Sequence, residues 1–516
     1  MADSPAMPNF LEDIFARLKR ADSRVVLREI HGEEFVGVSG RELLEQVRRV
    51  RAHLRRTGLQ PGERCALLAP NSARWVAFNL AFLAEGVIVV PLYARQAPAE
   101  LAAMMKDCLP RFLFTSDPAL GEAVAKALPP QWSSSRRLVL FDEVLQDPTA
   151  DAPPLDAPNL RQDADLVTII YTSGTSGEPK GVCLNVGNVT HMLSCTRERL
   201  DLLMAGTQQP DRVFHYGPFS FAASWVTLLT CLSRESILTL STDLTKLADE
   251  IRLASPHYFL NVPTLLERVR RGAEEALSKR AAPIRSLYAK AREAWLRKHA
   301  GRGRAMDGIW LGLGRKLIFS KIKERFGPNI RALICGSAPL APETQQFFLM
   351  LGIPVLQAYG LTETTAICTL DDPRVPVEPG YVGTAVNGVE MKVGENEEIV
   401  VRGPNIFPGY WNRPEETARV LQDGWFRTGD QGESNVRGNW RIIGRIKNLI
   451  VLNSGHKITP EPIEEKLARL LPNAQQVVVV GNERGFLCAL VTGSVEHAAV
   501  RSALDALNPE LPHYRQ

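Results

Sequence analysis

The sequence predicts an α/β protein with three parts: a large N-terminal domain of parallel α/β sheets, a small β subdomain, and a small mobile α+β domain at the C-terminus. Strand-like and helix-like segments alternate over most of the chain, which is typical of a parallel sheet covered on both faces. Short strand-like runs separated by turns begin at Gly383, and a compact helix-and-strand pattern follows Gly444. We therefore place the N-terminal domain at 1–443, its β subdomain at about 383–443, and the C-terminal domain at 444–516.

The elements of the large domain follow from the spacing of its apolar residues. Two segments with apolar residues at helical spacing are expected to be helices, at residues 40–57 and 73–84. Three short apolar runs are expected to be buried strands, at residues 65–68, 87–90 and 111–115. Pro91 is expected to end the second of these strands. Residues 147–158, rich in Pro, Asp and Ala, are expected to form a connector before an apolar strand at 166–170.

The later elements are shorter. Strands of the β subdomain are expected at residues 390–393, 398–401 and 440–443. In the C-terminal domain a helix is expected at 462–471 and a strand at 476–480.

The most informative stretch follows the strand at 166–170 and reads Tyr171-Thr-Ser-Gly-Thr-Ser-Gly-Glu-Pro-Lys-Gly181. Glycines let backbone N–H groups approach a ligand, and successive N–H groups form a concave anion site. Ser and Thr add hydroxyl donors, and Lys180 adds a positive charge. The spacing differs from the P-loop motif G-x-x-x-x-G-K-[ST]. The stretch alone fits a polar surface turn about as well as a loop that binds a polyphosphate.

Three further motifs carry chemical groups. Gln357-Ala-Tyr-Gly-Leu-Thr-Glu-Thr364 offers Tyr359, whose ring can stack on a flat base, and Glu363, an oxygen ligand suited to Mg²⁺. Gly424-Trp-Phe-Arg-Thr-Gly-Asp430 places a carboxylate after a glycine, where its two oxygens can accept from a diol. The third motif runs from Gly444 to Glu464. Taken singly, these residues also fit a core tyrosine, a solvated Glu and an Asp in a turn.

The four motifs, in this order, resemble those of the adenylate-forming superfamily, which contains acyl-CoA synthetases, luciferases and peptide-synthetase adenylation domains. The resemblance covers roughly residues 43–491 and is nearest to the medium- and long-chain acyl-CoA synthetases. It implies ATP, Mg²⁺ and coenzyme A as cofactors. A carboxylate would attack the α-phosphate of ATP to give acyl-AMP and pyrophosphate, and a thiol would then displace AMP. Positioning and charge neutralisation would supply the catalysis.

The resemblance also implies the site residues. Tyr359 would stack on adenine, Thr362 would contact the α-phosphate, Glu363 would bind Mg²⁺, and Asp430 would bind the ribose hydroxyls; Lys180, Thr362 and Glu363 are the expected catalytic residues. The expected ATP- and AMP-binding residues are Thr172, Ser173, Gly174, Thr175, Ser176, Gly177, Lys180, Gly336, Ser337, Ala338, Tyr359, Gly360, Thr362, Asp430, Ile442 and Arg445. Lys447 falls at the hinge position of the mobile domain, and Gly455 falls on the loop that lines the thiol tunnel.

The expected acyl pocket is the stretch Phe219-Ser-Phe-Ala-Ala-Ser-Trp225, with Phe219, Phe221, Ala222 and Trp225 as lining residues. Peptide-synthetase domains commonly have F-D-x-S here, where the Asp pairs with the substrate's amino group. Ala222 stands at the place of that Asp, so a buried substrate ammonium would lack a partner. We therefore expect an apolar acid, a medium- to long-chain fatty acid or a similar lipid acid. The aromatic residues also fit an ordinary core.

One expected feature is missing from the sequence. The small domain of the superfamily usually ends in a Gly-Lys segment whose lysine bridges the carboxylate and the α-phosphate. No lysine follows Lys466 in this chain. We therefore expect weak adenylation with retained transfer from a preformed acyl-AMP to a thiol, which exchange of pyrophosphate into ATP would test; exchange at the rate of a full-length relative would contradict this expectation.

Charge is unevenly distributed. The net charge is +4, but residues 268–331 hold 18 Lys and Arg against 5 Asp and Glu, so they carry +13 and the remainder carries −9. This basic segment, interleaved with aromatic and aliphatic residues, fits either a solvated helical face over core residues or an amphipathic surface for an anionic membrane or a polyanionic cosubstrate. Eight scattered cysteines without a C-x-x-C pair favour a reducing compartment and no zinc site.

The N-terminal residues show no apolar signal-peptide core, and no run of ~18 uncharged apolar residues occurs, so we expect a cytoplasmic protein, with peripheral contact at the inner membrane face. The expected partners are a carboxylic acid and coenzyme A, with no nucleic acid. Two alternatives remain open: an acyl-AMP ligase that loads an acyl carrier protein, and a catalytically impaired homologue that binds nucleotide or acyl groups. A Rossmann dehydrogenase is excluded because no G-x-G-x-x-G follows an early strand.

Overall fold

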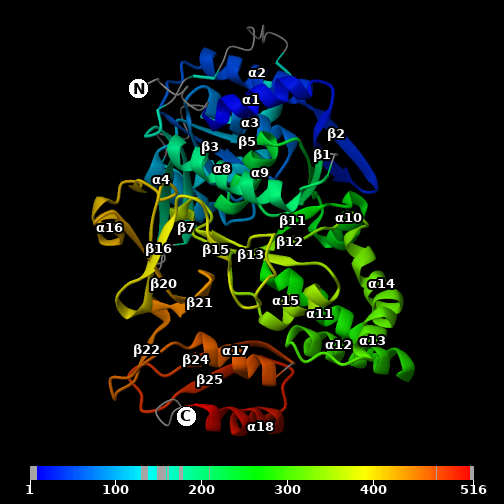
Figure 1. Cartoon of the computed structure of the whole chain (residues 1–516). Coiled ribbons are helices and arrows are strands. Elements are labelled where there is room, and N and C mark those ends of the chain that lie inside the picture. The colour runs from blue at the N-terminus through cyan, green and yellow to red at the C-terminus, as the bar shows by residue number, and fades with distance from the viewer. Residues whose placement is uncertain are drawn as a thin grey trace, which may run out of the picture.

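The computed structural model describes residues 9–129, 137–147, 158–159, 162–173, 178–207, 210–471 and 473–511. Figure 1 shows the blue part of the chain at the top, the green part in the middle and at the right, yellow and orange strands at the left, and a small C-terminal unit at the bottom. The predicted α/β class is confirmed.

The first sheet contains nine of the described strands. Its central strands, from β13 to β1, run parallel, and antiparallel strands close both edges. In spatial order the strands are β15 (Thr384–Ala385), β14 (Thr369–Leu370), β13 (Val355–Tyr359), β12 (Leu333–Cys335), β11 (Tyr258–Asn261), β9 (Asp211–His215), β10 (Ser236–Leu240), β1 (Val25–His31) and β2 (Glu34–Ser39).

The second sheet contains seven described strands. In spatial order they are β18 (Gly409–Tyr410), β8 (Pro179–Asn185), β7 (Leu166–Ser173), β4 (Ile88–Leu92), β3 (Arg64–Leu68), β5 (Phe112–Thr115) and β6 (Leu138–Leu140). The strands β7, β4, β3, β5 and β6 are parallel, but β8 runs antiparallel to β7. The predicted phosphate loop therefore joins the two strands of a hairpin, and its residues 174–177 lie outside the described part of the chain.

Helices fill the space between the sheets and cover their outer faces, so that the layers alternate. One hydrophobic core joins both sheets through the inner helices α1 (Phe10–Ala21), α2 (Gly40–Arg56), α3 (Ala73–Ala84), α8 (Val186–Leu203) and α9 (Ala222–Ser233). The outer face of the second sheet packs on α4 (Pro98–Cys108) and α5 (Pro118–Lys126). The outer face of the first sheet packs on α10 (Leu247–Ala254), α11 (Pro263–Ser278), α12 (Ala282–His299), α13 (Asp307–Gly314), η2 (Arg315–Phe319) and α15 (Pro342–Met350).

Shorter helical elements complete the described part of the chain. They are α7 (Phe141–Leu145), α14 (Ser320–Lys323), α16 (Pro414–Val420), η1 (Leu244–Lys246), η3 (Glu324–Phe326), η4 (Thr362–Thr364), η5 (Glu395–Glu397), η6 (Ile446–Asn448) and η7 (Asn508–Glu510).

Local sequence explains where the inner helices begin. Ser39 and Glu42 form a capping box at α2, because the Ser39 hydroxyl accepts from the Glu42 N–H at 3.2 Å and Glu42 accepts from the Ser39 N–H at 2.8 Å. Gly40 follows this cap, and a Cβ there would lie 2.4 Å from the carbonyl oxygen of Leu18 in α1. The start of α2 thus requires a glycine, since only a residue without a side chain allows the two helices to approach this closely.

Most predicted elements are confirmed within a few residues. The helix expected at 40–57 is α2, and the strand expected at 166–170 is the longer β7. The prediction that Pro91 ends its strand is wrong, because β4 continues to Leu92. Pro91 lies opposite Leu67 of β3 in a parallel pairing that continues to Leu92, so the missing N–H of the proline does not end the strand.

A third, antiparallel sheet forms the β subdomain beside the second sheet. Its described strands are β16 (Glu390–Val393), β17 (Glu398–Arg402), β20 (Trp425–Ser434), β19 (Leu421–Gln422) and β21 (Trp440–Arg445). Its core includes Ile399, Val401 and Trp440 and also draws in Leu370 of the first sheet. This core anchors the β20–β21 hairpin next to the end of β13.

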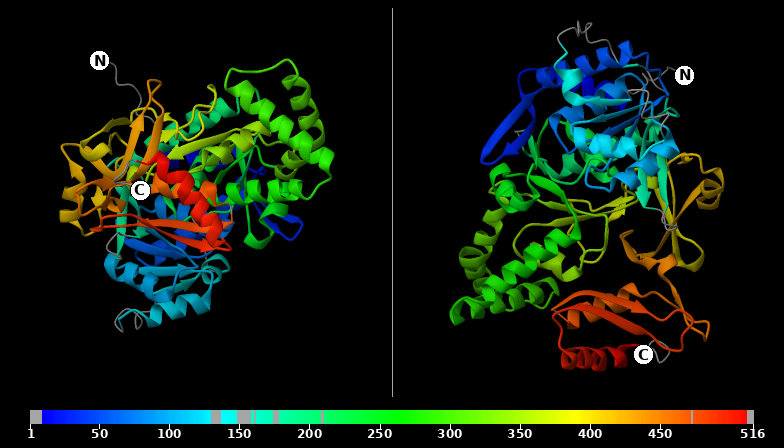
Figure 2. Two further views of the ribbon diagram at one scale, coloured as in Figure 1. Left: turned by 90° about the horizontal axis from the view of Figure 1, so that it is seen from below. Right: turned by 180° about the vertical axis from the view of Figure 1, so that it is seen from behind.

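The C-terminal unit has its own hydrophobic core, from Ile450 to Leu507. It contains β22 (Ile450–Val451), β23 (Lys457–Ile458), α17 (Glu461–Leu470), β24 (Ala474–Val480), β25 (Cys488–Gly493) and α18 (His497–Leu507). Figure 2 shows this unit, orange to red, at one end of the molecule. Polar contacts join it to the rest of the chain, including Thr459 to Gln431 at 2.9 Å, Lys457 to Asn396 at 3.3 Å and an Arg469–Glu343 ion pair at 3.2 Å.

The structure also bears on the expectations about membrane-spanning segments and cysteines. Among the described residues, no helix combines the length and the apolar character needed to cross a bilayer. All eight cysteines are free thiols, and seven of them are buried.

Asp371 gives the fold a pH dependence that can be measured. Its buried carboxylate accepts the Gln357 N–H at 2.8 Å, and burial raises its pKa to about 7 against the opposing hydrogen bond and the charge of Arg199. A folded-state pKa above the unfolded value of about 4 means that this group's stabilisation is complete below about pH 4 and is lost as the pH rises through about 7. The free energy of unfolding of the wild type should therefore fall over this range relative to Asp371→Asn, in urea titrations at a series of pH values.

Asp372 provides the matched control, because its pKa is lowered to about 2, chiefly by the Arg374 hydrogen bond. The stabilisation by Asp372 is present above the unfolded pKa and is lost only in acid. Relative to Asp372→Asn, the free energy of unfolding of the wild type should therefore rise, not fall, as the pH increases from acid. Parallel curves for the wild type and Asp371→Asn between pH 4 and 8 would contradict the assignment.

Candidate active site

The strands of the first sheet bring several predicted segments to one edge. β9, β11, β12 and β13 are parallel neighbours, so their carboxyl ends meet at the same edge of the sheet. The segments that leave this edge are 216–225 after β9, 336–338 after β12 and 360–364 after β13. In open α/β sheets, ligands bind at the carboxyl ends of the strands. The expected acyl and nucleotide residues therefore start from one edge.

Tyr359, the last residue of β13, contacts the β subdomain. Its hydroxyl donates to Asp430 Oδ2 at 2.8 Å. Asp430 lies on β20 directly opposite Arg445 on β21, and the guanidinium Nε lies 3.0 Å from Asp430 Oδ1. Both oxygens of the carboxylate thus have a donor, and three residues separated by up to 86 positions form one group, the Tyr359–Asp430–Arg445 group.

The electrostatics of this group are set mainly by burial. Asp430 is buried, which raises the pKa of its carboxyl group, while Arg445 and the Tyr359 hydroxyl act in the opposite direction. Burial and the neighbouring Asp430 raise the pKa of Tyr359 well above its usual value, so the phenol stays protonated and acts as a donor.

Glu363 lies four residues after Tyr359, in η4. Its Oε1 accepts from the Tyr410 hydroxyl at 2.8 Å, and its carbonyl oxygen accepts from the Phe407 N–H at 2.9 Å. Burial raises the pKa of Glu363, and the Tyr410 hydrogen bond and the charge of Arg445 oppose this shift. The carboxylate is therefore held in a site that favours a nearby cation.

Lys180 lies on β8 opposite Thr172 of β7, so these two expected phosphate-binding residues share one face of the hairpin. Its ammonium forms an ion pair with Glu416 of α16 and lies 5.5 Å from the centre of the Tyr410 ring. Burial, followed by the charge of Lys447, lowers the pKa of Lys180, while Glu363 raises it. Tyr410 thus connects the phosphate hairpin to Glu363.

Strained backbone surrounds these side chains. Ser337, Thr365 and Ala366 have φ angles of +72°, +53° and +87°, which non-glycine residues rarely adopt. Gly360 lies so close to the following turn that a Cβ would be 2.4 Å from the Ala366 carbonyl oxygen. Such strain persists only where the surrounding structure enforces it, and it concentrates at ligand sites.

The remaining nucleotide predictions have different outcomes. Gly174, Thr175, Ser176 and Gly177 lie outside the described residues, as does the side chain of Ser173. Ile442 on β21 packs against the same hydrophobic cluster as Tyr359. Gly336 and Ala338 flank Ser337 at the end of β12, and Thr362 begins η4 beside Glu363. Their ligand contacts stay predictions.

Lys447 and Gly455 lie in the segment that leads into the C-terminal unit. Lys447 is in η6, within electrostatic range of Lys180. Gly455 is exposed in the turn between β22 and β23, where its φ of +80° favours glycine. The described contacts do not bring Gly455 to the Tyr359–Asp430–Arg445 group, and its role in a thiol tunnel stays a prediction.

The expected acyl residues lie mostly in the core. Phe219 and Trp225 are fully buried and Ala222 is also buried; the Trp225 indole donates to Asn79 at 3.0 Å. The Phe219 ring stacks on His215 with centres 5.1 Å apart. Phe221 is 52% exposed, so it is the member of this set that borders open space. The apolar surroundings agree with the predicted apolar acid, without testing it.

Sequence reasoning missed two residues of the site. Tyr410 and Glu416 contact Glu363 and Lys180, respectively, from β18 and α16. Neither residue follows an informative spacing, and both meet their partners over long sequence separations. His215, buried with both ring nitrogens lacking a hydrogen bond within the described structure, ends β9, four positions before Phe219 of the predicted acyl segment.

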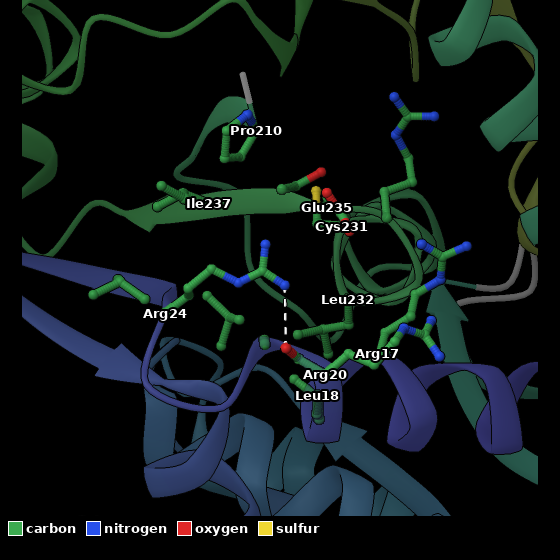
Figure 3. Close-up of a pocket in the computed structure, with 14 residues that line it drawn as sticks. Arg17, Leu18, Arg20, Arg24, Pro210, Cys231, Leu232, Glu235 and Ile237 are labelled. Atoms are coloured by element: carbon green, nitrogen blue, oxygen red, sulfur yellow. Dashed lines mark hydrogen bonds between the residues drawn. The ribbon is translucent and has the colours of Figure 1, made fainter. Parts of the chain in front are cut away.

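A separate small cavity of about 50 Å³ is lined by residues that include Arg17, Leu18, Arg24, Leu232 and Ile237 (Figure 3). The Arg24 guanidinium donates to the Arg20 carbonyl at 3.2 Å at its rim. The cavity touches the first residues of the parallel strands β1 and β10, so it lies at the amino edge of the sheet. It is therefore distinct from the site at the carboxyl edge.

The fold matches that of several solved structures. The o-succinylbenzoate CoA synthetase of Bacillus subtilis aligns with a TM-score of 0.76 over 99% of this chain and 93% of that chain; at 21% identity this likeness concerns the fold alone. ATP-bound MatB from Rhodopseudomonas palustris aligns with a TM-score of 0.75 at 25% identity, over 99% of this chain and 94% of that chain.

Sequence relatives cover most of the chain. The long-chain-fatty-acid–CoA ligase FadD15 of Mycobacterium bovis is 27% identical over 496 residues, 91% of this chain and 79% of that protein. Long chain acyl-CoA synthetase 1 of Arabidopsis thaliana is 30% identical over 471 residues, 82% of this chain and 69% of that protein. Residues 15–411 match the AMP-binding enzyme family and residues 447–512 match the AMP-binding enzyme C-terminal domain, so this chain belongs to the AMP-binding enzyme family.

Proposed function

We propose that this chain uses ATP and Mg²⁺ to activate a fatty carboxylic acid as acyl-AMP and then transfers the acyl group to coenzyme A. The single observation that carries the proposal is the convergence of these side chains: Glu363 lies within electrostatic range of Lys180 and of the Tyr359–Asp430–Arg445 group. Family membership and relatives named as long-chain acyl-CoA synthetases support it.

The nucleoside fits the Tyr359–Asp430–Arg445 group. Tyr359 ends β13, the neighbour of the strand β12 that leads into the glycine-containing segment 336–338, and its ring offers a flat surface for adenine. Asp430 presents a carboxylate that can accept from both hydroxyls of a ribose. Tyr359 and Arg445 favour the charged form of this carboxylate against the cost of burial, and the charged form is the stronger acceptor.

Glu363 fits the role of a magnesium ligand. Burial penalises its negative charge, and one of its two oxygens has the Tyr410 hydroxyl as a partner, so a cation at the other oxygen would offset the penalty. No group of three or more His, Cys, Asp or Glu side chains among the described residues could hold a metal ion. Phosphate and water oxygens would therefore supply the remaining ligands, as is common for Mg²⁺. The metal would neutralise charge on the phosphates.

Lys180 supplies a positive charge next to the phosphate hairpin. Its ion pair with Glu416 holds the ammonium near Tyr410 and Glu363. A phosphate oxygen that replaced Glu416 would gain a charge-assisted hydrogen bond from Lys180. The lysine would then stabilise the charge that develops as pyrophosphate leaves.

Two half-reactions at one site would explain a mobile C-terminal domain. We assign the hinge to residues 444–448, with the N-terminal domain at 1–443 and the C-terminal domain from 444 onward. Glu461 supports this assignment, because its Oε1 accepts from the Arg445 N–H at 3.3 Å and from the Asn448 side chain at 2.7 Å. A change in the backbone at Gly444 would exchange these contacts and present another face of the unit to the site.

The activity is tested by measuring pyrophosphate release with saturated acids of increasing chain length, with and without coenzyme A. We expect acid-dependent release that favours medium or long chains, and an acyl-CoA product. ATP binding without acid-dependent release would contradict the proposal and identify a binding homologue. Release followed by transfer to a phosphopantetheinylated carrier protein, but not to free coenzyme A, would identify an acyl-AMP ligase instead.

Lys180→Ala removes the positive charge beside the phosphates. Loss of a cation that stabilises transition-state charge in a dry site costs a few kcal/mol, so pyrophosphate release should fall about a hundredfold or more. Lys106→Ala, at an exposed position of α4, serves as the matched control and should retain activity. A loss of helical circular dichroism as large as the loss of activity would show instead that Lys180 is structural.

Tyr359→Phe keeps the ring and removes the hydroxyl that donates to Asp430. A hydrogen bond to a charged group contributes about 1.5–3 kcal/mol, so the Kd of a non-hydrolysable ATP analogue should rise about tenfold or more in calorimetric titrations. Tyr381→Phe is the matched control, because within the described structure the Tyr381 hydroxyl makes no hydrogen bond. If the wild type and Tyr359→Phe bound the ATP analogue with equal affinity, Asp430 would not be part of the nucleotide site.

A further inference from the structure

The helical run from α13 through η2 to α14 has two apolar faces. Leu311, Ile318 and Phe319 point into the second hydrophobic core and are buried. The chain continues as helix over residues 307–323, with a π-helical turn at η2. A helix at the surface of a globular protein normally needs one such face, with polar residues opposite.

The opposite face of this run is also apolar but has no cover among the described residues. Met306, Ile309, Leu313 and Leu317 are 54%, 53%, 41% and 45% exposed. Their spacing of three or four residues places them in one row along the helix. Four large aliphatic side chains in an exposed row cost solvation free energy, so the row fits a surface that is covered in use.

Cations surround the exposed row. Residues 298–325 hold eight Lys and Arg and two Asp and Glu, a net charge of +6. Arg315, Lys316 and Lys321 are exposed on the same helical run, and Arg302 and Arg325 flank it. In the part of the chain that the structure describes, these five side chains form no ion pair. The charges are therefore available to an external anionic surface.

We propose that this α13–α14 surface docks on the anionic face of a lipid bilayer. The surface consists of Met306, Ile309, Leu313, Leu317 and the cations Arg302, Arg315, Lys316, Lys321 and Arg325. The aliphatic side chains enter the boundary between headgroups and acyl chains, and the cations contact the lipid phosphates. Figures 1 and 2 show α13 and α14 at the outer edge of the molecule, where a flat bilayer can reach them.

Charge complementarity selects this occupant over a second copy of the chain. Two copies that met through this face would bring together two surfaces with a charge of +6 each, which repel. An anionic bilayer supplies negative charge as a partner for the cations and an apolar layer as a partner for the exposed row. The apolar row and the basic residues of 268–331, two independent features of the sequence, thereby acquire one explanation.

Vesicle co-sedimentation tests the proposal without reference to catalysis. The full chain should bind vesicles of phosphatidylcholine mixed with phosphatidylglycerol, and binding should weaken with added salt and with pure phosphatidylcholine. The affinity for anionic vesicles should fall at least about tenfold in each of the double variants Ile309→Glu/Leu313→Glu and Lys316→Glu/Lys321→Glu. All four positions are exposed, so both variants should keep the thermal stability of the wild type.

The matched control is Phe486→Glu/Leu490→Glu, which changes two side chains that are 55% and 60% exposed on the C-terminal unit. It should bind vesicles like the wild type. Failure to bind anionic vesicles, or an equal loss in the control, would overturn the proposal. If the wild type did not bind vesicles but formed a dimer, and Ile309→Glu/Leu313→Glu were monomeric, the surface would be an interface with a second copy of the chain. The surface variants should lose vesicle binding but keep acid-dependent pyrophosphate release. This difference separates the inference from the proposed function.

Discussion

Two neighbouring carboxylates, one buried and one partly buried, set the main physical constraint on this structure. Glu363 and Asp430 lose hydration, which raises the pKa of each, and each needs donors that the fold must supply. Tyr410 serves Glu363, while Tyr359 and Arg445 serve Asp430. These donors come from three different sheets, so the parts of the large domain must pack correctly before either charge is satisfied.

This constraint explains the arrangement of elements around the two carboxylates. β18 adds to the edge of the second sheet through its pairing with β8, which brings Tyr410 next to Lys180. The antiparallel register of β20 and β21 sets Arg445 opposite Asp430. The hydrophobic cluster beneath, which joins Leu370 to Ile399 and Trp440, fixes that hairpin against β13. Apolar packing thus holds polar groups whose own net contribution to stability is small.

Local patterns in the sequence were sufficient for much of the fold. The helix α2 and the strand β3 follow from apolar spacing and from turn residues that bound them. Motif order identified Lys180, Tyr359, Glu363 and Asp430, and the structure brings these four together. The hairpin formed by β7 and β8 could not be predicted, because the direction of a strand depends on its neighbour in the sheet. Tyr410 could not be predicted for the same reason, because its place in the site depends on a hydrogen bond to Glu363, 47 residues earlier in the chain.

The attachment of the C-terminal unit has an energetic consequence. Contacts such as Lys457 to Asn396 and Arg469 to Glu343 are polar and lie at least partly in solvent. Exposed polar pairs of this kind contribute about 0–1 kcal/mol each, because water offers nearly equal partners. Under the proposed function, rotation of the unit would therefore require little work, and a ligand bound at the site would set its orientation through a difference in affinity of a few kcal/mol between the two orientations. Binding and release of ligands would then control the order of the two half-reactions.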